Sequence, residues 1–115
     1  MILITAIAFL AMGLLALIAP QRITGMVDLP ALPMAARNEA RAVYGGFGVA
    51  IGALLLLSGH WPHWQPGVVL TVGVALLGMA MGRLVSWGID GRLERFTALF
   101  LVGEAALGTG LLLAL

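Results

Sequence analysis

The sequence predicts an all-α integral membrane protein, a four-transmembrane-helix bundle with antiparallel up-down topology. Hydrophobic residues make up 62% of the 115 residues and charged residues only 10%, whereas soluble domains carry roughly 25% charged residues. Four apolar stretches approach the ~20 residues that a helix needs to cross a bilayer. Backbone groups in hydrocarbon must bond within their own segment, which favours helices over open strands.

Residues that end helices separate the four stretches. Pro20 ends the first, because proline has no backbone N–H to donate. The glycines at 88 and 91 separate the third from the fourth. The second has an alternative start at Pro33, a favoured first-turn residue. We expect a single transmembrane domain over residues 1–115, with helices at about 2–19, 40–58, 67–87 and 96–115.

The positive charges predict the orientation. The chain has no lysine, and all its arginines lie in or beside the first and third loops: Arg22, Arg37, Arg41, Arg83, Arg92 and Arg95. Under the positive-inside rule these two loops face the cytoplasm. We therefore expect a multi-pass protein of a bacterial inner (cytoplasmic) membrane, with both termini on the periplasmic, outer side.

Glycine is abundant, at 16 residues, and two G-x-x-x-G pairs stand out. Such pairs let helix backbones approach closely in lipid. The expected packing positions are Gly45, Gly48 and Gly52 on the second helix, Gly78 and Gly82 on the third, and Gly108 on the fourth. Two interpretations stay open: packing within one tight bundle, or a face kept for another subunit.

Glu104 is the main candidate for a functional group. It lies about eight residues into the last expected helix, where a carboxylate is costly unless it is paired or protonated. Arg83, near the cytoplasmic end of the preceding helix, is its expected partner. The expected intramembrane polar network comprises Glu39, Arg41, Tyr44, Arg83, Asp90 and Glu104. It is either a helix-end network that pins the helices together or a site for a polar headgroup or a proton.

Several kinds of chemistry find no support in the sequence. There is no cysteine, and His60 and His63 have no neighbouring ligand that would complete a metal site. No phosphate-binding loop or nucleophile motif occurs. No basic run could follow a nucleic acid. We therefore expect no metal, no cofactor, no catalytic residue and no nucleic-acid partner.

Three pieces of sequence together resemble a known family. They are the segment 38–46 (NEARAVYGG), then Gly82-Arg83 with Asp90-Gly91 downstream, then Glu104. This pattern is similar to the domain-of-unknown-function 4345 family of small four-helix bacterial membrane proteins. The resemblance carries no activity. It implies that the charged residues of these pieces, with Tyr44, matter together.

Two functions are compatible with these observations. The first is an accessory or structural subunit, which packs against a larger membrane assembly or self-associates within the lipid bilayer. The alternative is a membrane-embedded binding or transport protein for a small polar, anionic or lipid ligand, using an Arg83–Glu104 site. An enzyme ranks third, because one acid–arginine network without a cofactor motif is thin support.

Overall fold

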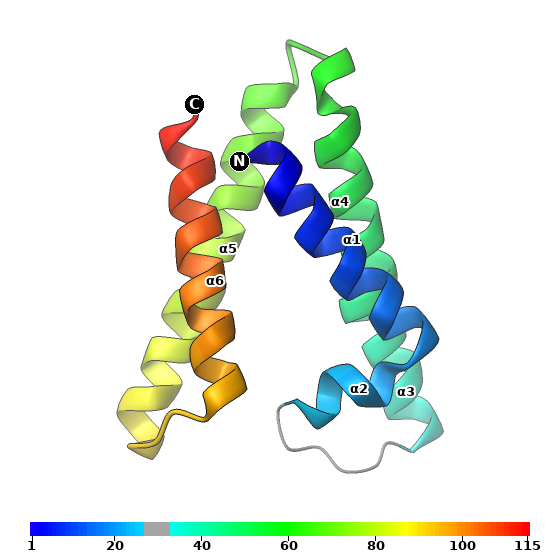
Figure 1. Cartoon of the computed structure of the whole chain (residues 1–115), viewed down its shortest axis with the longest axis vertical. Coiled ribbons are helices and arrows are strands. Elements are labelled where there is room, and N and C mark those ends of the chain that lie inside the picture. The colour runs from blue at the N-terminus through cyan, green and yellow to red at the C-terminus, as the bar shows by residue number, and fades with distance from the viewer. Residues whose placement is uncertain (27–32) are drawn as a thin grey trace. The chain divides into compact units, whose positions relative to one another are not determined.

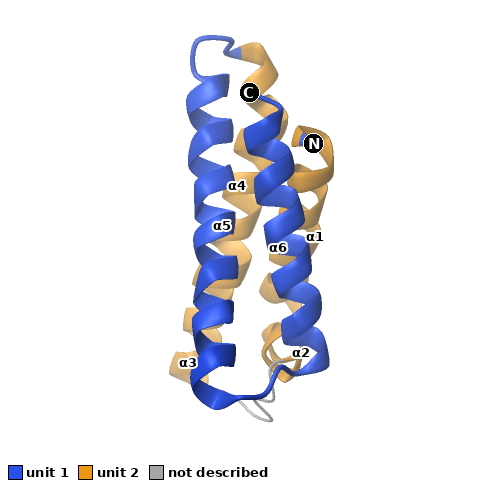
Figure 2. Cartoon of the chain, turned by 90° about the vertical axis from the view of Figure 1, so that its left-hand side faces the viewer, with its two compact units in different colours: residues 1, 61–115 blue, residues 2–60 orange. Residues whose placement is uncertain are grey.

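The described part of the chain is helical and divides into two compact units. The structure is a computed structural model that describes residues 1–26 and 33–115. Within these ranges every regular element is a helix, which confirms the all-α prediction. Unit 1 comprises residue 1 with 61–115, and unit 2 comprises residues 2–60 (Figure 2).

Unit 2 begins with an apolar helix that a proline ends. Helix α1 (Ile2–Ile18) stops before Pro20, as predicted from the missing N–H. Pro20 then occupies the first turn of a short second helix, α2 (Pro20–Gly25), where its fixed φ is favourable. Figure 1 shows α2 turning sharply away from the axis of α1. The Thr24 hydroxyl donates to the carbonyl O of Pro20 at 3.2 Å and so closes this turn.

A long helical run returns alongside α1. It consists of four consecutive elements, which are α3 (Met34–Ala40), the π-helical turn η1 (Arg41–Gly46), α4 (Phe47–Leu57) and the 3₁₀ turn η2 (Ser58–His60). The run starts at Met34, directly after Pro33, which agrees with the alternative start at Pro33 and not with the start at residue 40. The difference arises because a hydropathy criterion passes over the polar segment 37–39, although its residues continue the helix.

Glycine backbones form the contact between α1 and the returning run. A Cβ added at Gly48 would lie 3.2 Å from the Cα of Gly13 on α1. At Gly52 it would lie 2.9 Å from the carbonyl O of Ala6, and at Gly45 it would lie 2.8 Å from the side chain of Leu17. The three glycines predicted as packing positions on this run therefore lie against α1. Side chains at these positions would force the helices apart.

Unit 1 is an antiparallel helical hairpin. It consists of helix α5 (Gln65–Asp90) and helix α6 (Arg95–Leu113). Helix α5 extends slightly beyond the predicted 67–87, and α6 begins one residue before and ends two residues before the predicted 96–115. Gly91 ends α5 in the left-handed conformation, with φ 73°, which costs glycine little because it has no Cβ. Its N–H donates to the carbonyl O of Trp87 at 2.9 Å. This C-terminal cap lets the chain reverse within a few residues (Figure 1).

One glycine contact brings α5 and α6 close together. A Cβ added at Gly108 would lie 2.9 Å from the carbonyl O of Gly73, and one added at Gly73 would lie 3.0 Å from the side chain of Leu112. Gly78 and Gly82 behave differently, since an added Cβ there would meet no atom of this unit within 4 Å. The expectation that they form helix contacts is therefore not met within the hairpin. Gly82 follows Gly73 by about two and a half turns, which places it on the opposite side of α5.

The lengths of the helices bear on the predicted membrane spans. Three helical runs of the described residues are long and apolar enough to cross a membrane: Met34–His60, Gln65–Asp90 and Arg95–Leu113. The 17-residue α1 is apolar but shorter. At 1.5 Å per residue it spans about 25 Å, near the lower limit for a membrane-crossing helix.

The contact at Gly108 generates a stability prediction. Gly108→Leu should lower the free energy of unfolding by ~1–3 kcal/mol, because the new side chain meets the backbone of α5. Gly103→Leu on the same helix is the matched control, since an added Cβ there meets nothing within 4 Å. The control should be neutral or slightly stabilising, because leucine is the better helix former. Thermal unfolding of both variants in detergent measures the difference; equal effects would contradict the contact.

Candidate functional site

An arginine and a glutamate join the two helices of the hairpin. The Nε of Arg83 donates to Glu104 Oε2 at 2.8 Å, and its Nη2 donates to Glu104 Oε1 at 2.8 Å. Both carboxylate oxygens therefore accept from one guanidinium in the two-pronged geometry that makes such pairs strong. Arg83 and Glu104, expected as partners from the sequence, are in direct contact.

A phenylalanine supports the arginine from a second direction. The guanidinium carbon of Arg83 lies 5.2 Å from the ring centroid of Phe100. Phe100 precedes Glu104 by four residues on α6, a spacing that places both side chains on one helix face. The carboxylate and the ring together bind the guanidinium, because a cation is attracted to the face of an aromatic ring.

The ion pair is shielded from the surroundings. The side chain of Arg83 is 26% exposed and that of Glu104 only 11%. Glu104 lies nine residues after the first residue of α6, about 14 Å along its axis. At this depth the carboxylate of Glu104 is stabilised by Arg83, so losing the arginine leaves a shielded negative charge without its cation.

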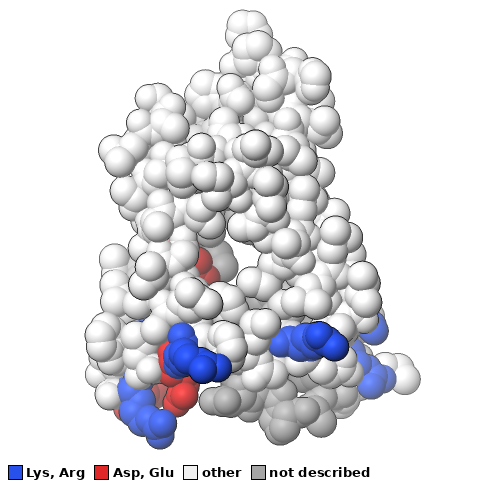
Figure 3. Space-filling model, viewed as in Figure 1, with Lys and Arg blue, Asp and Glu red and all other residues white. Residues whose placement is uncertain are grey.

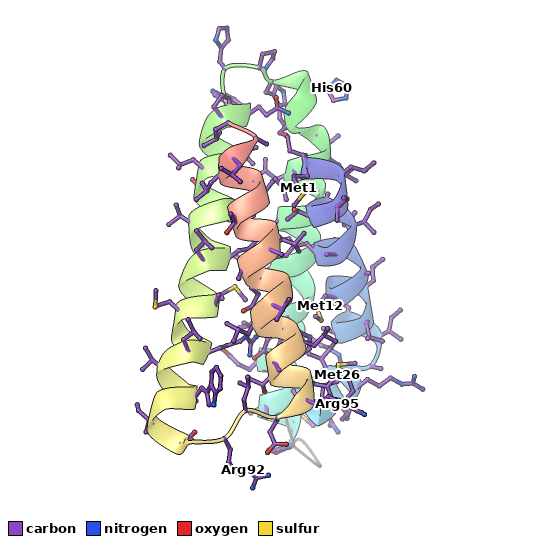
Figure 4. The ribbon with its side chains drawn as sticks, turned by 60° about the vertical axis from the view of Figure 1, so that its left-hand side comes forward. Met1, Met12, Met26, His60, Arg92 and Arg95 are labelled. Atoms are coloured by element: carbon purple, nitrogen blue, oxygen red, sulfur yellow. The ribbon has the colours of Figure 1, made fainter. Side chains whose placement is uncertain are left out.

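The remaining charges of this hairpin lie near its connecting loop. Asp90, predicted as part of the network, accepts a hydrogen bond from the hydroxyl of Ser86 at 3.4 Å. Arg92 and Glu94 form an exposed ion pair at 3.1 Å, and Figure 4 shows the side chain of Arg92 pointing away from the helices. Among the described residues, Asp90 therefore has its contact within its own helix end and not with Arg83.

The other three residues of the predicted network belong to unit 2. Arg41 donates through Nε to the carbonyl O of Leu17 at 3.1 Å, at the end of α1 where Pro20 removes a backbone donor. Glu39 and Tyr44 are exposed. Their participation in one network with Arg83 and Glu104 stays a prediction.

The described residues contain no group of three or more His, Asp or Glu side chains that could hold a metal ion. His60 ends the η2 turn, and its side chain points outward in Figure 4. The chemical capacity of the described site is therefore that of a single carboxylate–guanidinium pair: it can hold two helices together, accept a proton or exchange its partner for another ion.

Four contacts escaped prediction from the sequence. The contact of Phe100 could have been predicted, because Phe100 lies four residues before Glu104 and therefore on the same helix face. The contacts of Gly13 and Gly73 could not, because neither belongs to a G-x-x-x-G pair. The hydrogen bond from Arg41 to the carbonyl O of Leu17 starts from the first residue of the π-helical turn, and no sequence pattern predicts that turn.

The comparison with known families gives one match. The model of DUF4345, a domain of unknown function, matches residues 1–115, the whole chain. No curated protein and no solved structure matches the chain.

The ion pair generates a prediction about stability. Arg83→Ala should be more destabilising than Glu104→Gln, because the alanine variant leaves a shielded carboxylate without its cation, whereas the glutamine is neutral. Removing one partner of a buried pair costs ~3–5 kcal/mol. A double-mutant cycle, measured by unfolding in detergent, gives the coupling between the two side chains.

The exposed pair of Arg92 and Glu94 supplies the matched control cycle. Their side chains are 83% and 52% exposed, and exposed pairs couple by only ~0.2–1 kcal/mol. The coupling of Arg83 with Glu104 should clearly exceed this value. Additive effects at the shielded pair would show that the contact contributes nothing to stability.

Proposed function

Because the chain belongs to the DUF4345 family, which is described only as a domain of unknown function, we propose its function from its own geometry. We infer that it is an accessory or structural subunit of a larger membrane assembly. In this proposal its four apolar helices form a transmembrane bundle in a bacterial inner membrane. The observation that carries the proposal is a second small-residue face on α5, which the α5–α6 contact leaves free.

The surface of the helices supports the membrane location. Three helical runs have the length and apolar composition of membrane spans. Large apolar side chains are exposed on every long helix, among them Ile7, Phe47, Val74 and Val102. A water-soluble monomer rarely exposes so much apolar surface, whereas lipid is a suitable solvent for it. The 17 residues of α1 are at the lower limit of the length that crosses a bilayer.

The free face of α5 consists of four small residues. They are Thr71, Ala75, Gly78 and Gly82, all exposed. They repeat at three- and four-residue intervals and lie on the side of α5 opposite the Gly73 contact. Stripes of this kind allow another helix to approach closely in lipid, where packing rather than water exclusion drives association. Either another helix of this chain or a helix of a partner subunit would fit this requirement.

The ion pair supports a structural role more than a ligand site. Both carboxylate oxygens of Glu104 are already occupied by Arg83, and Phe100 lies against the guanidinium. A small anionic or polar ligand would compete with these partners for Arg83 and Glu104. The alternative function, binding or transport at this pair, therefore weakens the contact between the helices, which the accessory role does not.

Copurification tests the accessory role. The chain extracted from native membranes in mild detergent should carry a larger membrane protein in fixed proportion. The double variant Gly78→Leu/Gly82→Leu should lose that partner while its own unfolding temperature stays within a few degrees of the unaltered chain. Gly103→Leu, on α6, is the matched control and should keep the partner. A large fall in unfolding temperature would mean that the face packs within the chain, and absence of any partner would contradict the accessory role.

Cysteine labelling tests the proposed orientation. Gly25 and Gly59 suit single-cysteine variants because both are exposed and an added side chain meets nothing within 4 Å. With the first loop in the cytoplasm, Gly59→Cys should react with an impermeant maleimide on intact cells, and Gly25→Cys should react only after the membrane is opened. The reverse pattern would show that the topology is inverted.

A further inference from the structure

The six arginines of the chain differ in whether a partner lies beside them. Every arginine of unit 1 has one: Arg83 binds Glu104, Arg92 binds Glu94, and Arg95 lies 4.8 Å over the ring of Phe96. The sequence of this unit balances three arginines with three acidic residues. Two of its three arginines therefore form ion pairs with acidic side chains, and the formal charges of its arginines and acidic residues balance.

The arginines of unit 2 have no such neutralisation among the described residues. No carboxylate of residues 2–26 and 33–60 forms an ion pair with Arg22, Arg37 or Arg41. Arg41 donates through Nε to a backbone carbonyl, which carries no net charge. The sequence of this unit has three arginines against two acidic residues, so the net charge of +1 belongs to unit 2.

Local geometry brings these three arginines to one end of unit 2. Arg37 and Arg41 lie one helical turn apart, on the same side of the run, where like charges repel each other. Helix α2, which carries the exposed Arg22, contacts both α3 and η1. On the face seen in Figure 3, no acidic atom of residues 1–26 and 33–115 lies beside the arginine atoms over α2 and α3. Over the ends of α5 and α6, arginine and acidic atoms adjoin.

Apolar side chains project at the same end of the unit. Ile18, the last residue of α1, is 80% exposed, and Met34, the first residue of α3, is 77% exposed. Exposed apolar residues next to exposed cations are typical of segments that lie at the headgroup level of a membrane. There the apolar side chains enter the acyl region and the arginines meet the lipid phosphates.

From this arrangement we infer that Arg22, Arg37 and Arg41 bind the phosphate of an anionic phospholipid at the membrane surface. The inference rests on the membrane location proposed above and does not depend on the accessory role. A guanidinium matches the oxygens of a phosphate in the same two-pronged way that it matches a carboxylate. The bond from Arg41 to Leu17 fixes one guanidinium of the group before the lipid arrives, which reduces the ordering cost of binding.

The experiment counts bound lipids on the purified chain by native mass spectrometry. The chain in mild detergent is titrated with dioleoyl-phosphatidylglycerol or with dioleoyl-phosphatidylcholine. Each arginine near an anionic membrane surface strengthens association roughly fivefold. The double variant Arg22→Gln/Arg37→Gln should therefore bind phosphatidylglycerol roughly thirtyfold more weakly. It spares Arg41, whose backbone contact stabilises the fold.

Matched variants make the result specific. Arg92→Gln/Arg95→Gln removes the same charge from unit 1 and should leave phosphatidylglycerol binding unchanged. Arg22→Lys/Arg37→Lys keeps the charge and should retain most of the binding, which separates a lost site from a lost fold. Equal losses in the two glutamine variants would overturn the inference, because binding would then follow total charge. Equal binding of both lipids, or displacement of phosphatidylglycerol by millimolar inorganic phosphate, would also overturn it.

A separate measurement tests the membrane location on which the lipid site depends. Retention of the chain in membranes after an alkaline carbonate wash tests its membrane location without reference to lipid type. A chain that is retained but shows no preference for phosphatidylglycerol contradicts only the lipid site. A chain released by the wash contradicts the membrane location itself.

Discussion

The two-pronged ion pair between Arg83 and Glu104 fixes the register of α5 against α6. A two-pronged ion pair tolerates little sliding, because a shift of one helical turn, about 5.4 Å, would separate the charges. The contact of Gly73 with Gly108 lies farther along the same hairpin and sets how closely the backbones approach. One contact therefore determines the register and the other the separation, and the leucines between them pack in the space that remains.

Unit 2 joins its helices by different means. No ion pair of the described residues connects α1 with the returning helical run. Close backbone approach at Gly13, Gly48 and Gly52 replaces it, with the bond from Arg41 to the end of α1. This difference affects the charges as well: unit 1 pairs two of its arginines with acidic side chains, whereas no arginine of unit 2 forms an ion pair with Glu39, the acidic residue in the described part of that unit.

The sequence predicts the helices and the ion pair because in both cases few alternative structures are possible. Apolar runs of this length have few alternatives to helix, and Glu104 has few possible partners at its depth. The glycine contacts are harder to predict. A G-x-x-x-G pair identifies a face that can be approached closely, but it does not say which neighbour approaches. The hairpin accordingly uses Gly73, outside any such pair, and leaves the face of Gly78 and Gly82 free. The main predicted start of the second helical run, residue 40, was too late because polar residues such as Asn38 continue a helix without adding hydropathy, whereas the alternative start at Pro33 agrees with the structure.

The π-helical turn η1 has a consequence for how this chain tolerates changes in length. A π turn closes hydrogen bonds over five residues instead of four, so it contains one residue more than the corresponding α-helical turn. The side chains of α3, before residue 41, are thereby rotated by about 100° about the helix axis relative to those of α4, after residue 46. The glycine face of α4 can stay against α1 for any direction of the α3 side chains. The one additional residue of the π turn sets that direction. A lineage that lost it would keep the contact of α4 with α1 intact, while Arg37 on α3 pointed in a new direction.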